Sequence, residues 1–365
     1  MIHLDKLLKG VEVDWKTLGE VAELKRGTTI TKKTSNEGDF PVISGGQQPA
    51  YYIDQFNRSG ETITVAGSGA YAGYVMFWNE PIFVCDAFSI KTDESKVLPR
   101  YIFHFLLNFQ DKIHDLQSGG GVPHVYAKDV ARFQIPIPSL EIQQKIVEIL
   151  DSFTELTSEL TSELTARKQQ YEYYRDKLMT FNESDLEWRN LKEVSSVMRG
   201  RRLTKNQLSN ENKFPVYHGG LDPLGYYGQK NRPANSVMII NVGASAGTVG
   251  FSNIDFWSSD GCFCLEHSFR LNSKFLYYYI LGFQNHLKSK VRKAGIPTLD
   301  SSVIEKLRIP ILPLDEQEKI VTILDKFESI STSLSEGLPK EIELRKKQYE
   351  YYRDLLLTFP KKENT

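Results

Sequence analysis

The longest regular pattern in the sequence is a series of apolar residues spaced three and four positions apart. It occurs twice, each time over about forty residues. The first series contains Ile142, Ile146, Ile149, Phe153, Leu156, Leu160, Leu164, Tyr171, Tyr174, Leu178 and Phe181. The second contains Ile320, Ile323, Phe327, Ile330, Leu334, Leu338, Ile342, Tyr349, Tyr352, Leu356 and Phe359. This spacing predicts two coiled-coil helices, each a rod of roughly 60 Å at 1.5 Å per residue.

The two predicted helices most simply bury each other. Because each follows an equivalent segment, an antiparallel pairing would give a pseudo-two-fold particle with a lobe at each end. Gly337 and Pro339 fall near the middle of the second helix. Both residues disfavour a continuous helix, so we expect a kink or an interruption there.

The segments before the helices have a shorter apolar period. Runs such as "ETITVAG" and "SVMIINVG" are bounded by Gly, Pro and Asn and predict strands joined by turns. "RYIFHFLLNFQDKIHDL" and "KFLYYYILGFQNHLKSKV" predict one buried or amphipathic helix in each lobe. The predicted fold class is therefore α+β, with two tandem mixed α/β lobes, each followed by a long helix. The expected boundaries are 1–138, 139–182, 183–312 and 313–360, with a tail at 361–365.

The two halves of the chain repeat each other in sequence, as expected of a duplicated unit. Residues 167–181, "RKQQYEYYRDKLMTF", return at 345–359 as "RKKQYEYYRDLLLTF", identical at 12 of 15 positions. The other matching stretches are "WKTLGEVAELKRG" from Trp15 and "WRNLKEVSSVMRG" from Trp188, "FPVISGG" from Phe40 and "FPVYHGG" from Phe214, "GAYAGYVMF" from Gly69 and "GASAGTVGF" from Gly243, and "IPIPSLEIQQKIVEILDSF" from Ile135 and "IPILPLDEQEKIVTILDKF" from Ile309.

A polar helix face is repeated together with the apolar one. If the helices only hold the molecule together, packing explains the apolar positions but leaves the repeated polar ones unexplained. We therefore predict that the same partner surface docks at each copy. The repeated residues are Gln170, Glu172, Tyr173, Arg175 and Asp176 in the first helix, and Gln348, Glu350, Tyr351, Arg353 and Asp354 in the second. The loops of the two lobes differ instead, which predicts two related but different ligands.

Composition adds two constraints. The 365 residues carry a net charge of -1, but 141–181 holds 8 acidic against 5 basic side chains and 315–359 holds 10 against 7, so the remainder is net basic. Three cysteines are too few for a disulfide framework in this chain. The N-terminus lacks the apolar core of a signal peptide and no run is long enough for a membrane span, so we expect a protein of the reducing cytoplasm.

The order lobe, helix, lobe, helix resembles the DNA-specificity subunits of type I restriction-modification systems. The most specific elements are the openings "IPIP...EIQQKIVEILD" and "IPILPLDEQEKIVTILD" and the two "QYEYYRD" endings. The resemblance implies that each lobe is a target recognition domain reading one half of a split, asymmetric double-stranded DNA sequence. It also implies that the helices set the half-site spacing and bind two modification (methyltransferase) subunits, and that restriction subunits can join them.

The resemblance further implies that no cofactor is bound by this chain. S-adenosylmethionine, ATP and Mg are expected on the partner subunits, in a complex that methylates adenine and restricts DNA. A rod of roughly 60 Å suits two readers one or two turns of duplex apart, since one turn is about 34 Å.

Candidate DNA-binding residues are basic or amide side chains in the variable loops, with interleaved aromatic residues. Arg and Lys suit phosphates and guanine edges, and Gln suits adenine, although solvated turns and plain linkers have similar compositions. The candidates are Lys25, Arg26, Lys32, Lys33, Gln47, Gln48, Tyr51, His124, Arg199, Arg201, Arg202, Lys205, His218, Tyr226, Arg292 and Lys293.

Catalytic and metal motifs are not evident in the sequence. No G-K-[ST] occurs, so there is no Walker A loop, and no Pro-Pro pair occurs, so the D/N-P-P motif of amino-methyltransferases is missing. Cys262, Cys264 and His267 have no evident fourth zinc ligand, and we align Phe88 and Ile90 of the first lobe with the two cysteines.

Two alternatives remain open at this point. The chain could be a coiled-coil scaffold whose lobes bind proteins or glycans. It could also be a stand-alone nuclease or methyltransferase, which would require activity from this chain alone. We favour a non-catalytic subunit that selects the DNA while other subunits carry out the chemistry.

Overall fold

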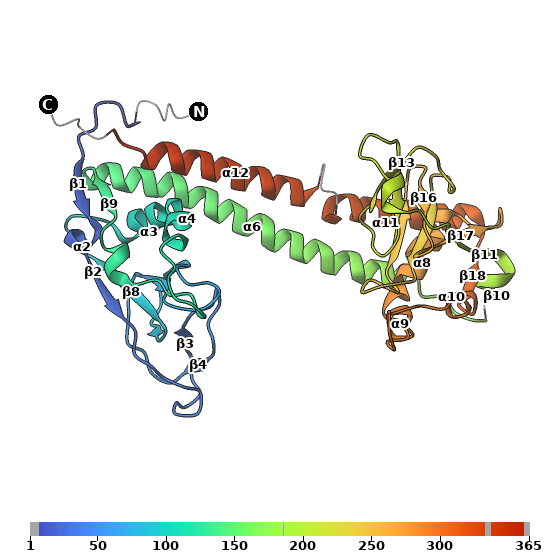
Figure 1. Cartoon of the computed structure of the whole chain (residues 1–365), viewed down its shortest axis with the longest axis horizontal. Coiled ribbons are helices and arrows are strands. Elements are labelled where there is room, and N and C mark those ends of the chain that lie inside the picture. The colour runs from blue at the N-terminus through green and yellow to red at the C-terminus, as the bar shows by residue number, and fades with distance from the viewer. Residues whose placement is uncertain (1–6, 185, 333–336, 361–365) are drawn as a thin grey trace. The chain divides into compact units, whose positions relative to one another are not determined.

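The computed structural model describes residues 7–184, 186–332 and 337–360 (Figure 1). The chain divides into two compact units: unit 1 comprises residues 1–161 and 341–365, and unit 2 comprises residues 162–340. Each unit contains one lobe and parts of the long helices α6 (Leu140–Leu178) and α12 (Leu338–Leu357), and unit 2 also contains the whole of α11 (Leu314–Thr332). No helix in the described ranges is long and apolar enough to cross a membrane.

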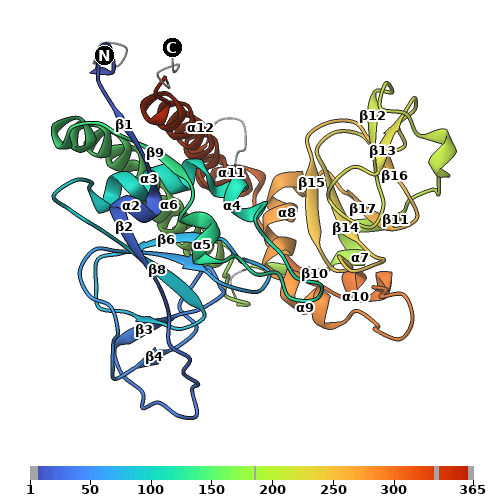
Figure 2. The same ribbon diagram turned by 60° about the vertical axis from the view of Figure 1, so that its left-hand side comes forward.

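The lobe of unit 1 is a mixed α+β domain. Its strands are β1 (Asp14–Thr17), β2 (Ala22–Arg26), β3 (Phe40–Ile43), β4 (Tyr52–Ile53), β5 (Thr62–Ala66), β6 (Val75–Trp78), β7 (Phe83–Val84), β8 (Ala87–Thr92) and β9 (Gln134–Ile137). Its helices are α2 (Leu18–Val21), α3 (Pro99–Asn108), α4 (Gln110–His114) and α5 (Ala127–Val130). The sheets have the orders β2-β8-β5-β6, β4-β3-β7 and β1-β9. In Figures 1 and 2, β3 and β4 lie on the side of the lobe away from α6.

The lobe of unit 2 repeats this topology. Its strands are β10 (Glu187–Asn190), β11 (Ser195–Arg199), β12 (Phe214–Tyr217), β13 (Gly225–Tyr227), β14 (Ser236–Ile240), β15 (Val249–Ser252), β16 (Trp257–Ser258), β17 (Cys262–His267) and β18 (Arg308–Ile311). Its helices are α7 (Leu191–Val194), η1 (Lys205–Gln207), α8 (Ser273–Gly282), α9 (Gln284–Ser289) and α10 (Ser301–Glu305). The sheets have the orders β11-β17-β14-β15, β13-β12-β16 and β10-β18. The predicted α+β class and tandem lobes are confirmed.

The prediction of a single helix in each lobe is wrong in one respect. Both copies break in two, at Phe109 and at Phe283, where the backbone leaves the helical region. The following residue then turns towards the sheet. The side chain of Gln110 accepts a hydrogen bond from the backbone N–H of Val75, and that of Gln284 accepts one from Val249. The break therefore satisfies the first backbone donor of β6 and of β15, which a straight helix would leave without this partner.

Each unit contains an antiparallel helix pair. In unit 1, Phe153 of α6 stacks on Tyr352 of α12 with ring centroids 5.2 Å apart, and the start of α6 shares a core cluster with the end of α12. In unit 2, Tyr174 of α6 stacks on Phe327 of α11, also at 5.2 Å. The predicted pairing of the long helices is confirmed within each unit.

The apolar series that predicted the two long helices does not predict correctly which of their residues are buried. Ile323 and Ile330 of α11 are 42% and 44% exposed, and Leu334 lies outside the described residues. Val321 and Leu324, which the series omits, are buried instead, as are Val147 and Leu150 of α6. Near a lobe, a helix packs against both the lobe and the other helix, so burial follows two faces rather than one seam.

The second long segment consists of two helices. Helix α11 ends at Thr332, residues 333–336 lie outside the description, and α12 begins at Leu338. Pro339 occupies the first turn of α12, where a missing backbone N–H costs little because no intrahelical acceptor faces it.

A buried glutamine fixes each lobe to its long helix. The side chain of Gln143 accepts a hydrogen bond from Leu98 N (2.9 Å) and donates to Lys96 O (3.1 Å) and Pro138 O (2.8 Å). Gln317 accepts from Asn272 N (2.8 Å) and donates to Arg270 O (2.9 Å) and Leu312 O (2.8 Å). Both side chains are fully buried.

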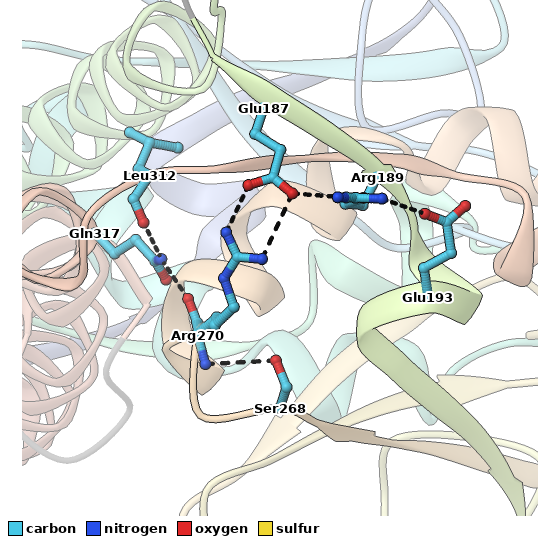
Figure 3. Close-up of polar contacts among 7 residues, drawn as sticks. All are labelled: Glu187, Arg189, Glu193, Ser268, Arg270, Leu312 and Gln317. Atoms are coloured by element: carbon cyan, nitrogen blue, oxygen red, sulfur yellow. Dashed lines mark hydrogen bonds and ion pairs between the residues drawn. The ribbon is translucent and has the colours of Figure 1, made fainter.

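Figure 3 shows the joint in unit 2, where Gln317 lies between Leu312 and Arg270. The guanidinium of Arg270 continues the network to Glu187 of β10 at 2.6 Å. Hydrogen bonds from Arg270 and then from Arg189 lower the pKa of Glu187 to about 2. Glutamine suits the joint because one amide both donates and accepts.

A second contact joins lobe and helices through a carboxylate. In unit 1, Asp151 of α6 pairs with Arg100 of α3 and lies 2.7 Å from His104 Nε2, while His104 Nδ1 lies 3.0 Å from the hydroxyl of Tyr349. In unit 2 the equivalent residues are Asp325 of α11, Lys274 of α8 at 3.2 Å, and Tyr278, whose hydroxyl donates to Asp325 at 2.5 Å.

Replacing Gln143 by Leu should destabilise unit 1 by about 2–4 kcal/mol, because three backbone groups, one in a buried and two in partly buried hydrogen bonds, would lose their partner. Denaturant unfolding of the full chain measures this. Gln144→Leu is the matched control, since Gln144 is the exposed neighbour in the same helical turn. Equal stabilities for the two variants would contradict the assigned role of Gln143.

The joint in unit 1 should make stability depend on pH. Burial lowers the pKa of His104 despite its hydrogen bond to Asp151. Burial raises the pKa of Asp151, but hydrogen bonds from His104 and Arg100 outweigh it and leave the pKa below its usual value. Both groups therefore bind fewer protons when folded, so stability is present above their unfolded pKa values and is lost as pH falls.

We expect the free energy of unfolding to decrease from about pH 7.5 to about pH 5, and less steeply in His104→Gln. Unfolding curves across this range measure the difference. His286→Gln, at an exposed position of α9, should keep the wild-type profile. A His104→Gln profile as steep as that of wild type would assign the dependence to other groups.

Candidate nucleic-acid and partner interfaces

Three loops of the first lobe meet beside its four-stranded sheet. His124 forms backbone bridges with Ser118 and with Ser68, and Gly69 N donates to Pro123 O at 3.0 Å. A Cβ at Gly45 would lie 2.3 Å from Ser68 O, so the turn carrying Gln47 and Gln48 must approach through a glycine. The structure thus brings His124 close to the turn that carries Gln47 and Gln48.

The second lobe has the same loop cluster. Thr298 forms backbone bridges with Arg292 and with Val242, and Gly243 N donates to Pro297 O at 2.9 Å. His218 lies on the neighbouring turn, 3.3 Å from Asp260. The structure thus brings Arg292 and His218 into one cluster, with the exposed Lys293 beside Arg292.

The basic residues at the ends of β2 and β11 are fixed by a glycine. A Cβ at Gly27 would lie 2.2 Å from Cys85 O, and one at Gly200 would lie 2.1 Å from Ser259 O. Arg201 is further held by its N–H, which donates to Ser258 O at 2.9 Å, and by its carbonyl, which accepts from Trp257 Nε1 at 2.7 Å. The side chains of Arg199, Arg201 and Arg202 remain exposed on this rigid backbone.

Arg26 is the basic residue that joins the first loop cluster. It lines a small pocket of about 60 Å³ together with His124, Tyr126 and Asp86. Lys25 instead lines a separate pocket of about 340 Å³ with Glu23, Arg58 and Lys91.

Lys32 and Tyr51 line a third pocket of the first lobe, of about 530 Å³, together with Tyr52. The hydroxyl of Tyr51 donates to Ile30 O at 3.0 Å and burial raises its pKa, whereas Tyr52 is 53% exposed. Lys33 is exposed on the same loop as Lys32. In the second lobe, Lys205 is exposed on η1 and Tyr226 is half-buried in β13.

Two exposed apolar residues in the clusters were missed in the sequence. Val122 and Ile296 occupy equivalent positions before Pro123 and Pro297 and are 54% and 71% exposed. The signal was present, since both loops keep an aliphatic residue between a glycine and a proline. Tyr71 and Tyr126 are 47% and 46% exposed and lie on loops of the first lobe's cluster.

The alignment of the cysteines by sequence is wrong by one residue. Strand pairing matches Arg26 with Phe88 and Arg199 with Phe263, so Cys262 and Cys264 correspond to Ala87 and Ser89 rather than to Phe88 and Ile90. Over the ranges that the structure describes, no group of three His, Cys, Asp or Glu side chains could hold a metal ion.

The repeated helix faces have nearly the same local structure. Tyr173 and Tyr351 are 61% and 64% exposed, and each packs edge-on against the next tyrosine at 5.3 Å. Glu172 and Asp176 are exposed in the first copy, as are their equivalents Glu350 and Asp354 in the second.

The arginines of these faces are less accessible than the sequence suggested. The side chains of Arg175 and Arg353 are 18% and 17% exposed. Each guanidinium lies over a tyrosine ring, 5.8 Å from Tyr171 and 5.5 Å from Tyr349. Gln170 and Gln348, both half-buried, accept hydrogen bonds from Arg167 and Arg345. The accessible part of each face is therefore a tyrosine flanked by two carboxylates.

Comparisons with known proteins all match this chain to DNA specificity subunits of type I restriction systems. A model of the type I restriction modification DNA specificity domain matches residues 11–167 and 183–344. The specificity subunit of the Escherichia coli type I restriction enzyme EcoR124I/EcoR124II is 31% identical over 100% of this chain and 98% of its own length. A putative type I restriction enzyme specificity subunit from Haemophilus influenzae is 34% identical over 98% of each chain.

A solved structure has the same fold. The crystal structure of the S subunit of a type I restriction-modification system from M. genitalium matches with a TM-score of 0.72 at 21% identity, over 96% of this chain and 98% of that one.

Proposed function

Because the chain belongs to the family of type I restriction-modification DNA specificity subunits, we propose that each lobe reads one half of a split, asymmetric DNA target. The chain is the DNA specificity subunit of a type I complex. The proposal concerns how its residues divide this task.

The observation that carries the proposal is one backbone frame with two sets of side chains. Gly69 binds Pro123 in the first lobe as Gly243 binds Pro297 in the second. On this shared frame, His124 of the first lobe corresponds to Thr298 of the second. Base edges are distinguished by side-chain donors and acceptors, so unlike side chains on one frame favour unlike half-sites.

We assign the loop residues to two kinds of contact. The exposed Arg199, Arg201 and Arg202 suit phosphates or guanine edges, and the exposed Gln47 and Gln48 suit adenine. The other candidate positions remain proposed DNA contacts. Val122 and Ile296 join them as apolar groups at the loop tips, a kind of side chain that some DNA-binding proteins insert between base steps.

The partners follow from the repeated faces. We propose that two modification subunits dock at Tyr173 and at Tyr351, and that 139–182 and 313–360 set the spacing of the half-sites. A restriction subunit is a further partner in this scheme. The methyl donor S-adenosylmethionine, ATP and Mg would bind the partner subunits.

A genome-wide methylation map, with and without this chain, tests the function as a whole. The host carries the modification subunit in both cases. We expect one asymmetric split motif to disappear when the chain is deleted. If no motif depends on the chain in an expressed complex, DNA selection by this chain is refuted.

Replacing Arg201 and Arg202 by Ala should weaken DNA binding by the assembled complex. If both contact phosphates, the slope of log affinity against log salt should fall by about two units, since each phosphate contact contributes about 0.9. Titrations at several salt concentrations measure this. The control is Lys192→Ala, an exposed basic position on α7, which should bind like wild type. An unchanged affinity and slope in the double variant would remove these residues from the interface.

Replacing Tyr173 or Tyr351 by Ala should in each case weaken the binding of one modification subunit, the one that docks at the substituted residue. Exposed tyrosines at the centre of an interface commonly contribute about 2 kcal/mol or more, or roughly 30-fold in affinity. At a free concentration about five times the wild-type dissociation constant, native mass measurement should show mainly two copies on the wild-type chain and mainly one on either variant, since a 30-fold weaker site is then mostly empty. Glu155→Ala, exposed on α6 outside the repeated face, should retain two copies. A wild-type complex saturating at one copy would contradict the duplicated docking site.

A further inference from the structure

Two lysines lie together on the outer face of the four-stranded sheet of unit 1. Strands β2 and β8 pair antiparallel (Figure 1), with Glu23 opposite Lys91 and Lys25 opposite Ser89. Successive side chains of a strand point to opposite faces of the sheet. These four side chains therefore share one face, whereas the residues that alternate with them, such as Ile90, pack in the core.

This face forms one wall of the pocket of about 340 Å³ that contains Lys25. The segment 56–59 supplies another part of the lining, including Arg58. The charged lining residues are three cations, Lys25, Arg58 and Lys91, against the single carboxylate of Glu23, which gives a net charge of +2. Among the described residues, neither lysine forms an ion pair.

The charge of Arg58 is not neutralised by a carboxylate either. Among the described residues, its guanidinium forms hydrogen bonds only with neutral groups. Nε donates to Ser89 Oγ at 2.7 Å, and the Nη atoms donate to Asn57 O at 2.7 Å and to Arg26 O at 3.2 Å. Burial lowers the pKa of Arg58, and the attraction of Glu23 does not outweigh this effect. Because arginine stays charged at neutral pH, the pocket contains a partly buried cation that an anion would stabilise.

The second lobe has an equivalent arginine, but its charge is paired. The Nη atoms of Arg232 donate to Asn231 O at 2.7 Å and to Arg199 O at 3.3 Å, which are the contacts that Arg58 makes in the first lobe. In addition, Nη1 of Arg232 lies 3.8 Å from a carboxylate oxygen of Glu266. The second lobe thus supplies from its own chain the negative charge that the first lobe lacks at this place.

The lysines are replaced as well. Strand pairing places Met198 at the position of Lys25 and Glu266 at the position of Lys91. Lys230, in the matching loop of the second lobe, is already paired with an aspartate at 2.7 Å. The two lobes therefore share the backbone frame here but differ in charge, since only the first lobe has an excess of cations.

The chemistry of the pocket suits a phosphate group. Ammonium and guanidinium groups are the usual partners of phosphate oxygens in proteins, and the exposed Ser59 adds a hydroxyl donor. Lys25 is followed in β2 by Arg26, which lines the pocket of the first loop cluster with His124. DNA bound at that cluster carries one backbone charge for every 3.4 Å of each strand, so phosphates beside the half-site come near this strand.

We propose that this pocket is a phosphate-binding site of the first lobe, formed by Lys25, Arg58 and Lys91, with no counterpart in the second lobe. A backbone phosphate beside the first half-site and the phosphate of a free nucleotide present the same chemical group. The DNA source rests on the proposed function, whereas the phosphate site itself does not. Since phosphate contacts carry no sequence information, the site strengthens binding without changing the sequence that is read.

The first test is a calorimetric titration of the full chain with inorganic phosphate at constant ionic strength. The variant Lys25→Met plus Lys91→Glu gives the first lobe the residues of the second, and we expect at least a 10-fold loss of phosphate affinity. The matched control, Lys112→Met plus Lys9→Glu, removes the same charge at exposed positions that do not line the pocket. It should bind phosphate like wild type.

The reciprocal exchange, Met198→Lys plus Glu266→Lys, should add a phosphate site to the second lobe. A gain of binding cannot come from loss of fold, and equal thermal midpoints in chloride exclude loss of fold for the first exchange. If the first exchange leaves phosphate affinity at the wild-type level, or the reciprocal exchange adds no binding, the proposal is wrong.

The second test identifies the source of the phosphate, using the assembled complex and duplexes that carry the split motif. With a backbone phosphate in the pocket, the first exchange lowers the slope of log affinity against log salt by about one unit, since each contact contributes about 0.9, and the methylated motif stays the same. With a free nucleotide, the slope equals that of the matched control, and adenosine monophosphate binds the DNA-loaded wild-type complex but not the exchanged one. A methylation map without a motif that depends on the chain would refute the proposed function and leave the phosphate titration unaffected.

Discussion

Each lobe depends on three backbone groups being satisfied by one fully buried glutamine where it meets its long helix. In unit 1 these are Leu98 N, Lys96 O and Pro138 O, all bound by Gln143. A buried amide or carbonyl without a partner is costly, so this geometry fixes the entry of the helix, the strand before it and the start of α3 together. The loop that follows β5 belongs to the same four-stranded sheet as β8, the strand that leads into this joint.

Around that joint, the two units keep a geometry and change its chemistry. His104 bridges Asp151 and Tyr349 in unit 1, whereas Tyr278 binds Asp325 and Glu328 in unit 2. The same holds in the loops, where shared backbone hydrogen bonds carry different side chains. This division agrees with the proposed function, in which one frame would present two different sets of loop side chains to the two halves of the target.

The sequence predicted much of the candidate site and missed parts for identifiable reasons. The repeated helix face was visible because Tyr173 and Tyr351 recur within an identical polar context, although the structure places Arg175 and Arg353 mostly against tyrosine rings. Gln143 was missed, since a glutamine in the first turn of a helix resembles an ordinary surface residue. Its role depends on carbonyls that the chain brings there from 96 and 138.

The sequence by itself determined the repeat, the two kinds of element and the family, because periodicity and duplicated motifs are local properties of the chain. Only the tertiary structure decided which apolar residues are buried. Ile146 and Ile320 belong to the same sequence pattern, yet only Ile146 is fully buried, in a cluster packed by Leu7 and Leu8 from far along the chain. Burial depends on which side chains from distant parts of the chain pack against a residue, and no local sequence pattern contains that information.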